Sequence, residues 1–395
     1  MTIKHKYQVQ TGLDILKSQE FSSLRNKRVA ILANQASISK DFLHIIDLAN
    51  NYGVKIVKLF APEHGLSGAL QYMETVHKIY DTRLNVEVIS LYGDNEESLK
   101  LKAQDLQDID ILLCDLWDIG TRYYTFHCTI AWAMSACAIN GTKLMVVDRP
   151  NPINADIFEG NSILRPNYSF VGAYPLLNRH GFTMGELLRY VRDQQNIDVD
   201  LEIIWMSNYQ RNTYLDDTDL PFIAPSPNMP NLNAALTYPG TCLFEATNVS
   251  EGRGTCYPFE LIGAPYIKDP YKFKEQIDNL GFNGVYVRPM YFKPLYNKWA
   301  LENCAGIFIH ITDRQAFKPL RFALGMLSIC MQYDGFKLRS EPYEFVSDRP
   351  ALDLLLGDEK LRHMLYDKAS MKEFDEYFIK EEISHNTLRK SWLYY

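Results

Sequence analysis

The segment Asn248–Thr255 (NVSEGRGT) combines residue types that support chemistry and do not fill a hydrophobic core. It places the carboxylate of Glu251 and the guanidinium of Arg253 among two glycines and small polar residues that include Ser250. A positioned carboxylate can act as an acid, a base or a nucleophile, and a guanidinium can hold an anionic group through a bidentate fork. The alternative is an ordinary capped turn with Ser250 or Asn248 as the N-cap. The segment alone favours that turn, so the chemical interpretation needs support from elsewhere in the chain.

A second segment of the same character, Leu59–Gly68, lies far away in the sequence. The hydrophobic run at 54–60 is typical of a buried strand, and it ends in a glycine-containing loop that carries Glu63 and His64. This position favours a general acid or base role for Glu63, which His64 could tune through a hydrogen bond. A solvent-facing turn is the alternative. Two acid-bearing, glycine-rich loops are what a hydrolase with two catalytic carboxylates requires.

Size and charge restrict the class of protein. The chain has 395 residues, 47% of them hydrophobic and 23% charged, which is enough for two globular domains. A net charge of −7 without a long basic run argues against nucleic-acid binding. Aromatic residues make up 13% of the chain, which suits stacking against sugar rings, although most such rings belong to hydrophobic cores.

The N-terminal segment 1–7 lacks the apolar stretch of a signal peptide. We therefore expect a cytoplasmic protein, or a periplasmic one if a leader has been trimmed. The seven cysteines form no CxxC pair and are interpreted as buried free thiols rather than disulfides or zinc ligands. No apolar run is long enough to span a membrane, so membrane insertion is not expected.

The first half of the chain alternates predicted strands and helices. Strands are predicted at 28–34, 54–60, 86–91, 109–116, 144–147 and 201–206, and helices at 41–52, 96–106, 124–140 and 183–195. Gly141 is a C-cap signal, and Thr183 with Glu186 forms a capping box. The alternation predicts an α/β, Rossmann-like domain with a mostly parallel sheet covered on both faces. Neither GxGxxG nor GxxxxGK[ST] occurs, so a nucleotide site is not supported.

The proline-rich stretch 221–240 is interpreted as an extended crossing between two domains. The chain beyond it mixes strands predicted at 284–287 and 306–312 with helices at 271–279, 317–331, 358–366 and 371–379. This predicts a Rossmann-like domain at 1–232 and a smaller α+β domain at 233–395. Glu63 then belongs to the first domain and Glu251 to the second, and a cleft between domains is a preferred place for a ligand site.

Polar residues follow five of the predicted strands. Functional groups of a parallel sheet lie beyond the carboxyl ends of its strands, where this sequence places Asn34, Glu63, His64, Tyr92, Asp115, Asp118, Asp148 and Arg149. Arg149 could grip a carboxylate or pair structurally with Asp148. The residues Arg122, Tyr123 and Tyr124 could line a sugar-binding wall or pack at the start of a helix.

A metal site is an alternative use of some of these residues. Asp115 and Asp118 could act as ligands together with His64 or His127. Metal ligands have to converge, and no HxH, HExxH or DxDxD spacing is present. We therefore expect a site without a metal ion or other cofactor.

Taken together, these motifs resemble the NamZ family of exo-β-N-acetylmuramidases, glycoside hydrolase family 171, formerly a domain of unknown function. The resemblance extends in order over nearly the whole chain. It rests on Thr11–Asp14, Leu59–Gly65, Ser90–Gly93, Asp118–Thr125, Asp148–Pro152, Arg179–Gly181, Pro225–Pro230, Asn248–Thr255, Pro258–Glu260 and Gly263–Pro265. Ser67 stands where arginine is common in the family, and Trp117 where glutamine is usual.

The resemblance implies an enzyme that releases terminal N-acetylmuramic acid from the non-reducing end of peptidoglycan fragments. It implies a cleft between a Rossmann-like domain and a smaller one, with Glu63 and Glu251 as the catalytic pair. The substrate carries a lactyl carboxylate, for which Arg253, Arg122 and Arg149 are the candidate partners, in that order. The full substrate-binding set that we expect is His64, Asn34, Tyr92, Asp118, Arg122, Tyr123, Tyr124, Asp148, Arg149, Asn228, Ser250 and Arg253.

Two other functions remain open from the sequence. The first is a non-catalytic protein that binds cell-wall glycans. The second is a metal-dependent hydrolase that uses His64, Asp115 and Asp118.

Overall fold

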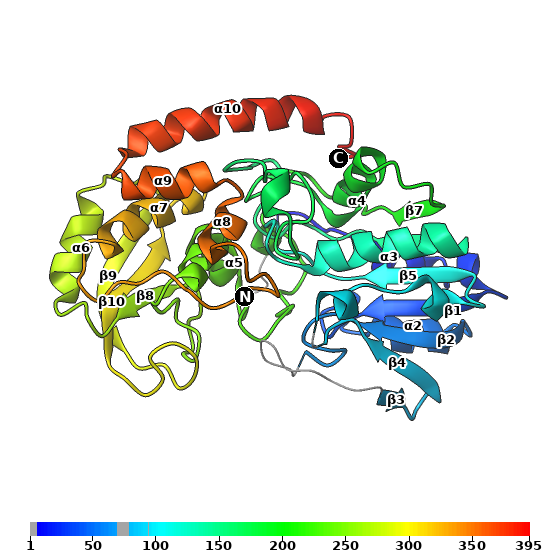
Figure 1. The fold of residues 1–395 in the computed structure, drawn as a ribbon. Helices are drawn as coiled ribbons and strands as arrows, with labels where there is room; N and C mark the ends of the chain where they lie inside the picture. The colour runs from blue at the N-terminus through cyan, green and yellow to red at the C-terminus, as the bar shows by residue number, and fades with distance from the viewer. Residues whose placement is uncertain (1–5, 69–78, 94) are drawn as a thin grey trace.

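The computed structural model describes residues 6–68, 79–93 and 95–395, which form a larger and a smaller β-sheet, each packed against helices (Figure 1). The larger sheet has seven strands in the order β3-β4-β2-β1-β5-β6-β7. Its strands are β1 (Arg28–Ala33), β2 (Lys55–Ala61), β3 (Ile79–Asp81), β4 (Val86–Ser90), β5 (Ile111–Asp115), β6 (Lys143–Val147) and β7 (Leu201–Ile204). Every pairing is parallel except the edge pairing of β3 with β4, which confirms the predicted mostly parallel sheet.

The chain reverses its direction of progress across the sheet at β1. It adds β2 and β4 on one side of β1, and then β5, β6 and β7 on the other. Such a switch point leaves a crevice beyond the carboxyl ends of the two central strands. Here the loops after β1 and β5 meet, and the Ser37 hydroxyl donates a hydrogen bond to the Asp115 carbonyl. The topology therefore brings the polar residues that follow these strands to one edge of the sheet.

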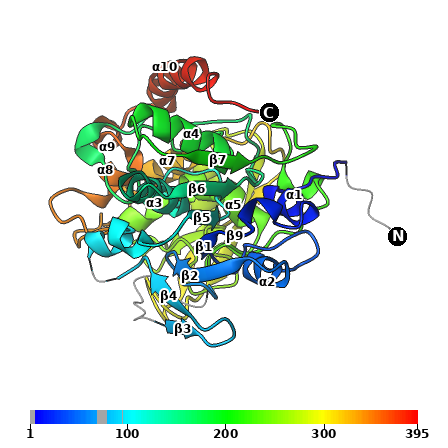
Figure 2. The same cartoon turned by 90° about the vertical axis from the view of Figure 1, so that its right-hand side faces the viewer.

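Helices cover both faces of this sheet (Figure 2). Alternate residues of a strand point to opposite faces of the sheet. Val29 and Ile31 belong to one buried cluster together with residues of α1 (Gly12–Ser18) and α2 (Ile45–Asn51). Ala30 and Leu32 belong instead to the cluster that contains α3 (Phe126–Asn140) and α4 (Met184–Gln194). The strands are apolar on both sides because both faces are buried.

The smaller sheet is antiparallel and has the order β8-β10-β9. It consists of β8 (Leu261–Ala264), β9 (Val285–Phe292) and β10 (Cys304–Ile311), with α5 (Leu232–Thr241), α6 (Pro270–Asp278), α7 (Pro319–Cys330), α8 (Ala351–Leu356), α9 (Glu359–Tyr366) and α10 (Met371–Arg389) around it. Residues of α5, α7 and α8 share one continuous buried cluster with α3 and α4. This is the predicted smaller α+β part, and its core joins that of the larger sheet.

Local signals account for several boundaries. Gly141 ends α3 with a left-handed φ of 74°, and Thr183 and Glu186 form the predicted capping box of α4. The predicted helix at 96–106 is wrong, because that segment forms two short 3-10 helices, Glu96–Leu99 and Ala103–Leu106. The prediction of an extended 221–240 is also wrong beyond Asn231, whose side chain caps α5.

The C-terminal segment connects the two parts of the molecule. Helix α10 crosses from the smaller part towards α4 and β7, where the chain ends (Figure 1). Tyr394 stacks on Trp205 with ring centroids 4.0 Å apart. The Tyr395 hydroxyl donates to Asp148 Oδ2 at 2.7 Å and accepts from the Met206 amide at 2.7 Å.

Replacing Tyr395 with Phe should lower the free energy of unfolding by about 1–3 kcal/mol, the usual cost of leaving buried polar groups without a partner. The Met206 amide would lose its acceptor, whereas Asp148 Oδ2 would keep its hydrogen bond from the Thr183 hydroxyl. Urea-induced unfolding would measure the change. Tyr394→Phe is the control, because the Tyr394 ring can stack on Trp205 with or without its hydroxyl. An equal effect of the two substitutions would contradict the prediction.

The segment 1–5, which contains most of the residues assessed for an export signal, lies outside the described residues. Within the described ranges, no helix combines the length and apolar character that are needed to cross a membrane. All seven cysteines have free thiols, as predicted, and six of them are buried. Cys256 differs from the prediction because it is exposed.

Candidate active site

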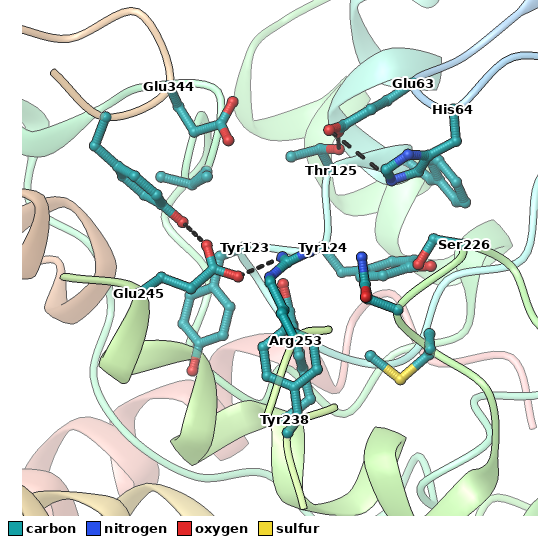
Figure 3. Close-up of a pocket in the computed structure, with 16 residues that line it drawn as sticks. Glu63, His64, Tyr123, Tyr124, Thr125, Ser226, Tyr238, Glu245, Arg253 and Glu344 are labelled. Carbon is teal, nitrogen blue, oxygen red and sulfur yellow. Dashed lines mark hydrogen bonds and ion pairs between the residues drawn. The ribbon is translucent and has the colours of Figure 1, made fainter. Parts of the chain in front are cut away.

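A cavity of about 570 Å³, including its mouth, lies where the two parts of the chain meet. Figure 3 shows the side chains that surround it. They come from the loop after β2, the start of α3, the proline-rich segment, α5, and the smaller part of the chain. The lining residues are Glu63, His64, Tyr123, Tyr124, Thr125, Phe126, Val171, Ser226, Asn228, Met229, Tyr238, Glu245, Arg253, Phe259, Tyr343 and Glu344.

Glu63 enters the cavity from the carboxyl end of β2, as its position in the sequence predicts. Its side chain is 11% exposed. The Thr125 hydroxyl donates to Glu63 Oε2 at 3.1 Å, and His64 Nε2 lies 3.9 Å from Glu63 Oε1 (Figure 3). His64 has a left-handed φ of 71°, and the Gly65 amide bonds to the Pro62 carbonyl at 3.0 Å. A tight turn therefore holds a nearly buried carboxylate at the cavity.

Aromatic rings form one wall. Tyr238 packs edge-on against Tyr124, with centroids 5.8 Å apart, and against Phe259, with centroids 4.6 Å apart. Burial raises the pKa of the Tyr124 and Tyr238 phenols well above their ordinary value, so both stay protonated at neutral pH. Such a wall offers flat apolar faces and polar tips to a sugar ring. Tyr123 and Tyr124 thus line the cavity, as predicted.

Arg253 and Glu245 form a buried ion pair on the opposite side of the cavity from Glu63 (Figure 3). Arg253 Nη2 donates to Glu245 Oε1 at 2.6 Å, and the Tyr343 hydroxyl donates to Glu245 Oε2 at 2.7 Å. Burial alone would lower the pKa of Arg253, but the charges of Glu245 and Glu251 raise it above its ordinary value. Burial likewise opposes ionisation of Glu245, and Arg253 lowers the pKa of that carboxyl. The pair is therefore fully charged.

Glu251 does not line this cavity. Its Oε2 accepts a hydrogen bond from Lys298 Nζ at 2.7 Å, and its Oε1 lies 3.4 Å from Arg253 Nε. The side chain is 2% exposed and faces a smaller cavity with Glu245, Arg253, Asn297, Lys298 and Arg339. The resemblance implies a catalytic role for Glu251, which stays a prediction; in the structure its carboxylate contacts Lys298 and Arg253.

Several predicted binding residues surround the cavity without lining it. Asn34 donates from Nδ2 to the Pro225 carbonyl at 3.3 Å and so supports the segment that carries Ser226 and Asn228. Tyr92 packs against Phe345, with centroids 6.3 Å apart. Ser250 forms an antiparallel bridge with Gly263 at the base of the Arg253 loop.

The structure places the remaining predicted residues in buried structural networks. Arg122 is fully buried, and its guanidinium donates to the carbonyls of Asn161, Leu176 and Leu355. Arg149 donates from Nη2 to Asp115 Oδ2 at 2.7 Å. With these partners, and outside the cavity lining, neither guanidinium is placed to bind a lactyl carboxylate.

Asp118 and Asp148 also have structural partners. Asp118 lies 3.2 Å from His127 Nδ1 and 3.3 Å from His180 Nε2. Asp148 accepts from the Gly185 amide at 2.8 Å and from the Thr183 hydroxyl at 3.0 Å, at the start of α4. Neither residue lines the cavity.

The metal-site alternative finds no ligand set among the described residues, where no three His, Cys, Asp or Glu side chains are grouped suitably. Asp115 is paired with Arg149, and Asp118 lies between two histidines, whereas His64 lies beside Glu63 at the cavity. The three residues that this alternative requires are therefore not brought together.

The buried carboxyl group of Asp148 should make the free energy of unfolding depend on pH. Burial raises its pKa from 3.8 to about 7, against the opposing effect of the Gly185 amide. Between these two pH values the folded state holds a proton that the unfolded chain has released, so the free energy of unfolding falls as the pH rises. The stability of the wild type should therefore decline from pH 5 to pH 8 more than that of Asp148→Asn. Parallel declines in urea unfolding at the two pH values would contradict this prediction.

Three residues that the sequence did not indicate also line the cavity: Glu245, Tyr343 and Glu344. Glu245 lies in the short helix that follows α5, and Glu344 in a turn after the last strand, so neither follows a strand of the parallel sheet. The sequence offers one signal for Glu344, an acidic residue two positions after Pro342 in the segment between two predicted helices. That signal is too weak to separate it from an ordinary surface glutamate.

A nearly buried carboxylate, an aromatic wall and a guanidinium surround one cavity, an arrangement that suits a hydrolase acting on a negatively charged sugar. Residues 29–233 match the family described as "Exo-beta-N-acetylmuramidase NamZ, N-terminal", and residues 236–395 match its C-terminal counterpart. The chain belongs to this family of glycoside hydrolases.

Individual relatives agree with this assignment. The chain is 38% identical, over 99% of its length and 92% of the relative's, to the peptidoglycan beta-N-acetylmuramidase NamZ of Bacillus subtilis strain 168. Two crystal structures of DUF1343 family proteins from Bacteroides fragilis have the same fold. One matches with a TM-score of 0.87 at 27% identity and the other with 0.76 at 26%, and each alignment covers 98% of this chain and 99% of the other.

Proposed function

We propose that this protein hydrolyses the β-linkage of a terminal N-acetylmuramic acid at the non-reducing end of peptidoglycan fragments, with Glu63 as the general acid. The observation that carries the proposal is the presence of Glu63 and Arg253 in one cavity between the two parts of the chain. Family membership supports the substrate class, and the geometry supports the role of each residue.

Glu63 is suited to protonate the leaving oxygen. It is nearly buried at the cavity, and its Thr125 and His64 neighbours fix the orientation of the carboxyl group. When the bond from the anomeric carbon to the leaving oxygen breaks, the electron pair stays with the oxygen and the proton of Glu63 neutralises it. Water supplies the hydroxyl group of the released sugar.

Arg253 is suited to bind the lactyl carboxylate. Among the described residues that line the cavity, it is the sole Arg or Lys. Glu245, Glu251 and the Phe259 ring, 5.1 Å from the guanidinium carbon, hold it in place. A guanidinium binds a carboxylate with two parallel hydrogen bonds, which distinguishes a muramic acid residue from a glucosamine residue that lacks the lactyl group.

The position of the cavity favours a terminal sugar. Side chains from both parts of the chain surround it, so one terminal residue can enter while the rest of the glycan stays outside. This arrangement supports exo-acting hydrolysis.

Turnover of 4-nitrophenyl β-N-acetylmuraminide tests the proposed activity. We expect equimolar release of nitrophenol and free N-acetylmuramic acid, and a much lower kcat/KM for the corresponding glucosaminide. Binding of the muraminide without any product would overturn the proposal in favour of a non-catalytic glycan-binding protein. The calorimetric binding isotherm and the product assay together separate these two functions.

A further inference from the structure

Among the residues that the structure describes, three glutamates line the cavity. Glu63 contacts Thr125 and His64. Glu245 engages both of its oxygens, one with Arg253 and the other with Tyr343. Glu344 extends into the cavity from the side opposite Glu63 (Figure 3). Glu245 therefore holds Arg253, and the Glu344 carboxylate lies across the cavity from Glu63 (Figure 3).

The backbone at Glu344 adopts a costly conformation. The Tyr343 amide donates to the Val346 carbonyl at 3.0 Å, and the Val346 amide donates back at 2.9 Å, which closes a tight two-residue turn. Glu344 and Phe345, the central residues, have φ values of 46° and 69°. Turns with two positive φ values strongly favour Gly, Asn and Asp, and bulky residues in this region are genuine outliers.

The neighbours of Glu344 hold this turn against the cavity. Tyr343 contacts Glu245, and the Phe345 ring packs against Tyr92 at the end of β4. The turn is thus anchored to both parts of the chain. Backbone strain of this kind is retained where the surroundings enforce it, commonly at functional sites.

We infer that Glu344 is the second catalytic carboxylate, opposite Glu63 at the anomeric carbon. This inference rests on the proposed hydrolysis of a β-muramoyl linkage. It transfers to Glu344 the role that the sequence assigned to Glu251, which lies behind Arg253 in contact with Lys298.

The chemistry balances in either mechanism that uses two carboxylates. With inversion, the oxygen of water bonds to the anomeric carbon, Glu344 takes the water proton, and the leaving oxygen receives the proton of Glu63. With retention, a Glu344 oxygen bonds to the anomeric carbon as the leaving oxygen takes that proton. Water then displaces Glu344, and its proton returns to Glu63. One water molecule is consumed in both cases.

The substitution Glu344→Gly separates catalysis from folding. Glycine adopts a positive φ without steric cost, so the variant should unfold at the same temperature as the wild type or a higher one. Lys368→Gly is the matched control, because Lys368 is also at a positive φ of 55° but is exposed and does not line the cavity. We expect Glu344→Gly to lose at least 100-fold in kcat with 4-nitrophenyl β-N-acetylmuraminide, and Lys368→Gly to lose nothing.

Chemical rescue with azide identifies the role. A small anion can occupy the space left by the Glu344 side chain and attack the anomeric carbon from that side. We expect azide to restore nitrophenol release by Glu344→Gly at least tenfold and to yield the α-glycosyl azide, whereas Glu251→Gly is not rescued. Wild-type turnover by Glu344→Gly, or a lost activity that azide does not restore, would overturn the inference. An inactive wild type would instead overturn the proposed function.

Discussion

Glu63→Gln should lower kcat for a natural N-acetylmuramoyl–N-acetylglucosamine linkage by about 10²- to 10⁴-fold, the usual contribution of a general acid. The amide of glutamine is nearly the same size as the carboxyl group and can still accept from Thr125. The variant should therefore fold and bind substrate with little change in KM. What it loses is the proton for the leaving oxygen.

A substrate whose leaving group needs no proton provides the control for this prediction. Nitrophenolate departs without protonation, so Glu63→Gln should retain far more of its activity on the 4-nitrophenyl muraminide than on the disaccharide. Glu302→Gln, at an exposed position, should match the wild type on both substrates. An equal loss on the two substrates would show that Glu63 does not act as the acid.

Arg253→Lys should lower the preference for muraminides over glucosaminides by about 10- to 100-fold, because hydrogen bonds to charged groups contribute about 1.5–3 kcal/mol. Lysine keeps the positive charge between Glu245 and Glu251 but lacks the planar fork that holds a carboxylate. A neutral residue at position 253 would be a poorer test of substrate preference, because it would also destabilise the fold. Removing one partner of a buried pair destabilises a protein by about 3–5 kcal/mol.

The ratio of kcat/KM values for the two 4-nitrophenyl glycosides measures this effect. Lys298→Arg is a suitable control, because Lys298 pairs with Glu251 but faces the smaller cavity. It should leave the ratio near that of the wild type. A variant Arg253→Lys with unchanged preference would place the lactyl-binding group elsewhere.

The larger sheet was predictable because hydrophobic periodicity and capping signals are local. The runs that became β1, β2, β5 and β6 are mostly apolar, which is typical of strands with both faces covered. Helix α5 was not predicted, since Pro239 and the preceding prolines indicate extended chain while tertiary packing maintains the helix. The extension of α10 beyond residue 379 has a similar cause, because its anchors, such as Tyr395 on Asp148, are distant in sequence.

Site residues that directly follow a strand of the parallel sheet could be predicted from the sequence. Glu63 and His64 follow β2, and the topology of a parallel sheet brings that loop to the functional edge. The difference in position between Glu251 and Glu344 was not predictable in this way. It depends on which side of Arg253 each carboxylate lies and on a strained turn, and neither can be read from residue type or spacing.

The domain boundary near residue 232 stays a prediction, although the two family matches change over at a similar position. The continuous buried cluster across both sheets indicates that the two parts depend on one another for stability. Since the cavity uses side chains from both, we expect neither part to be active alone.

We propose that a terminal N-acetylmuramic acid enters the cavity between the two parts of the chain and is cleaved off as a single residue. Digestion of two defined glycans, one ending in N-acetylmuramic acid at its non-reducing end and one ending in N-acetylglucosamine, tests it most directly when the products are followed by mass spectrometry. We expect one free N-acetylmuramic acid from the first glycan, after which cleavage stops, and no product from the second. Internal fragments, or cleavage of the glucosamine-ended glycan, would contradict it.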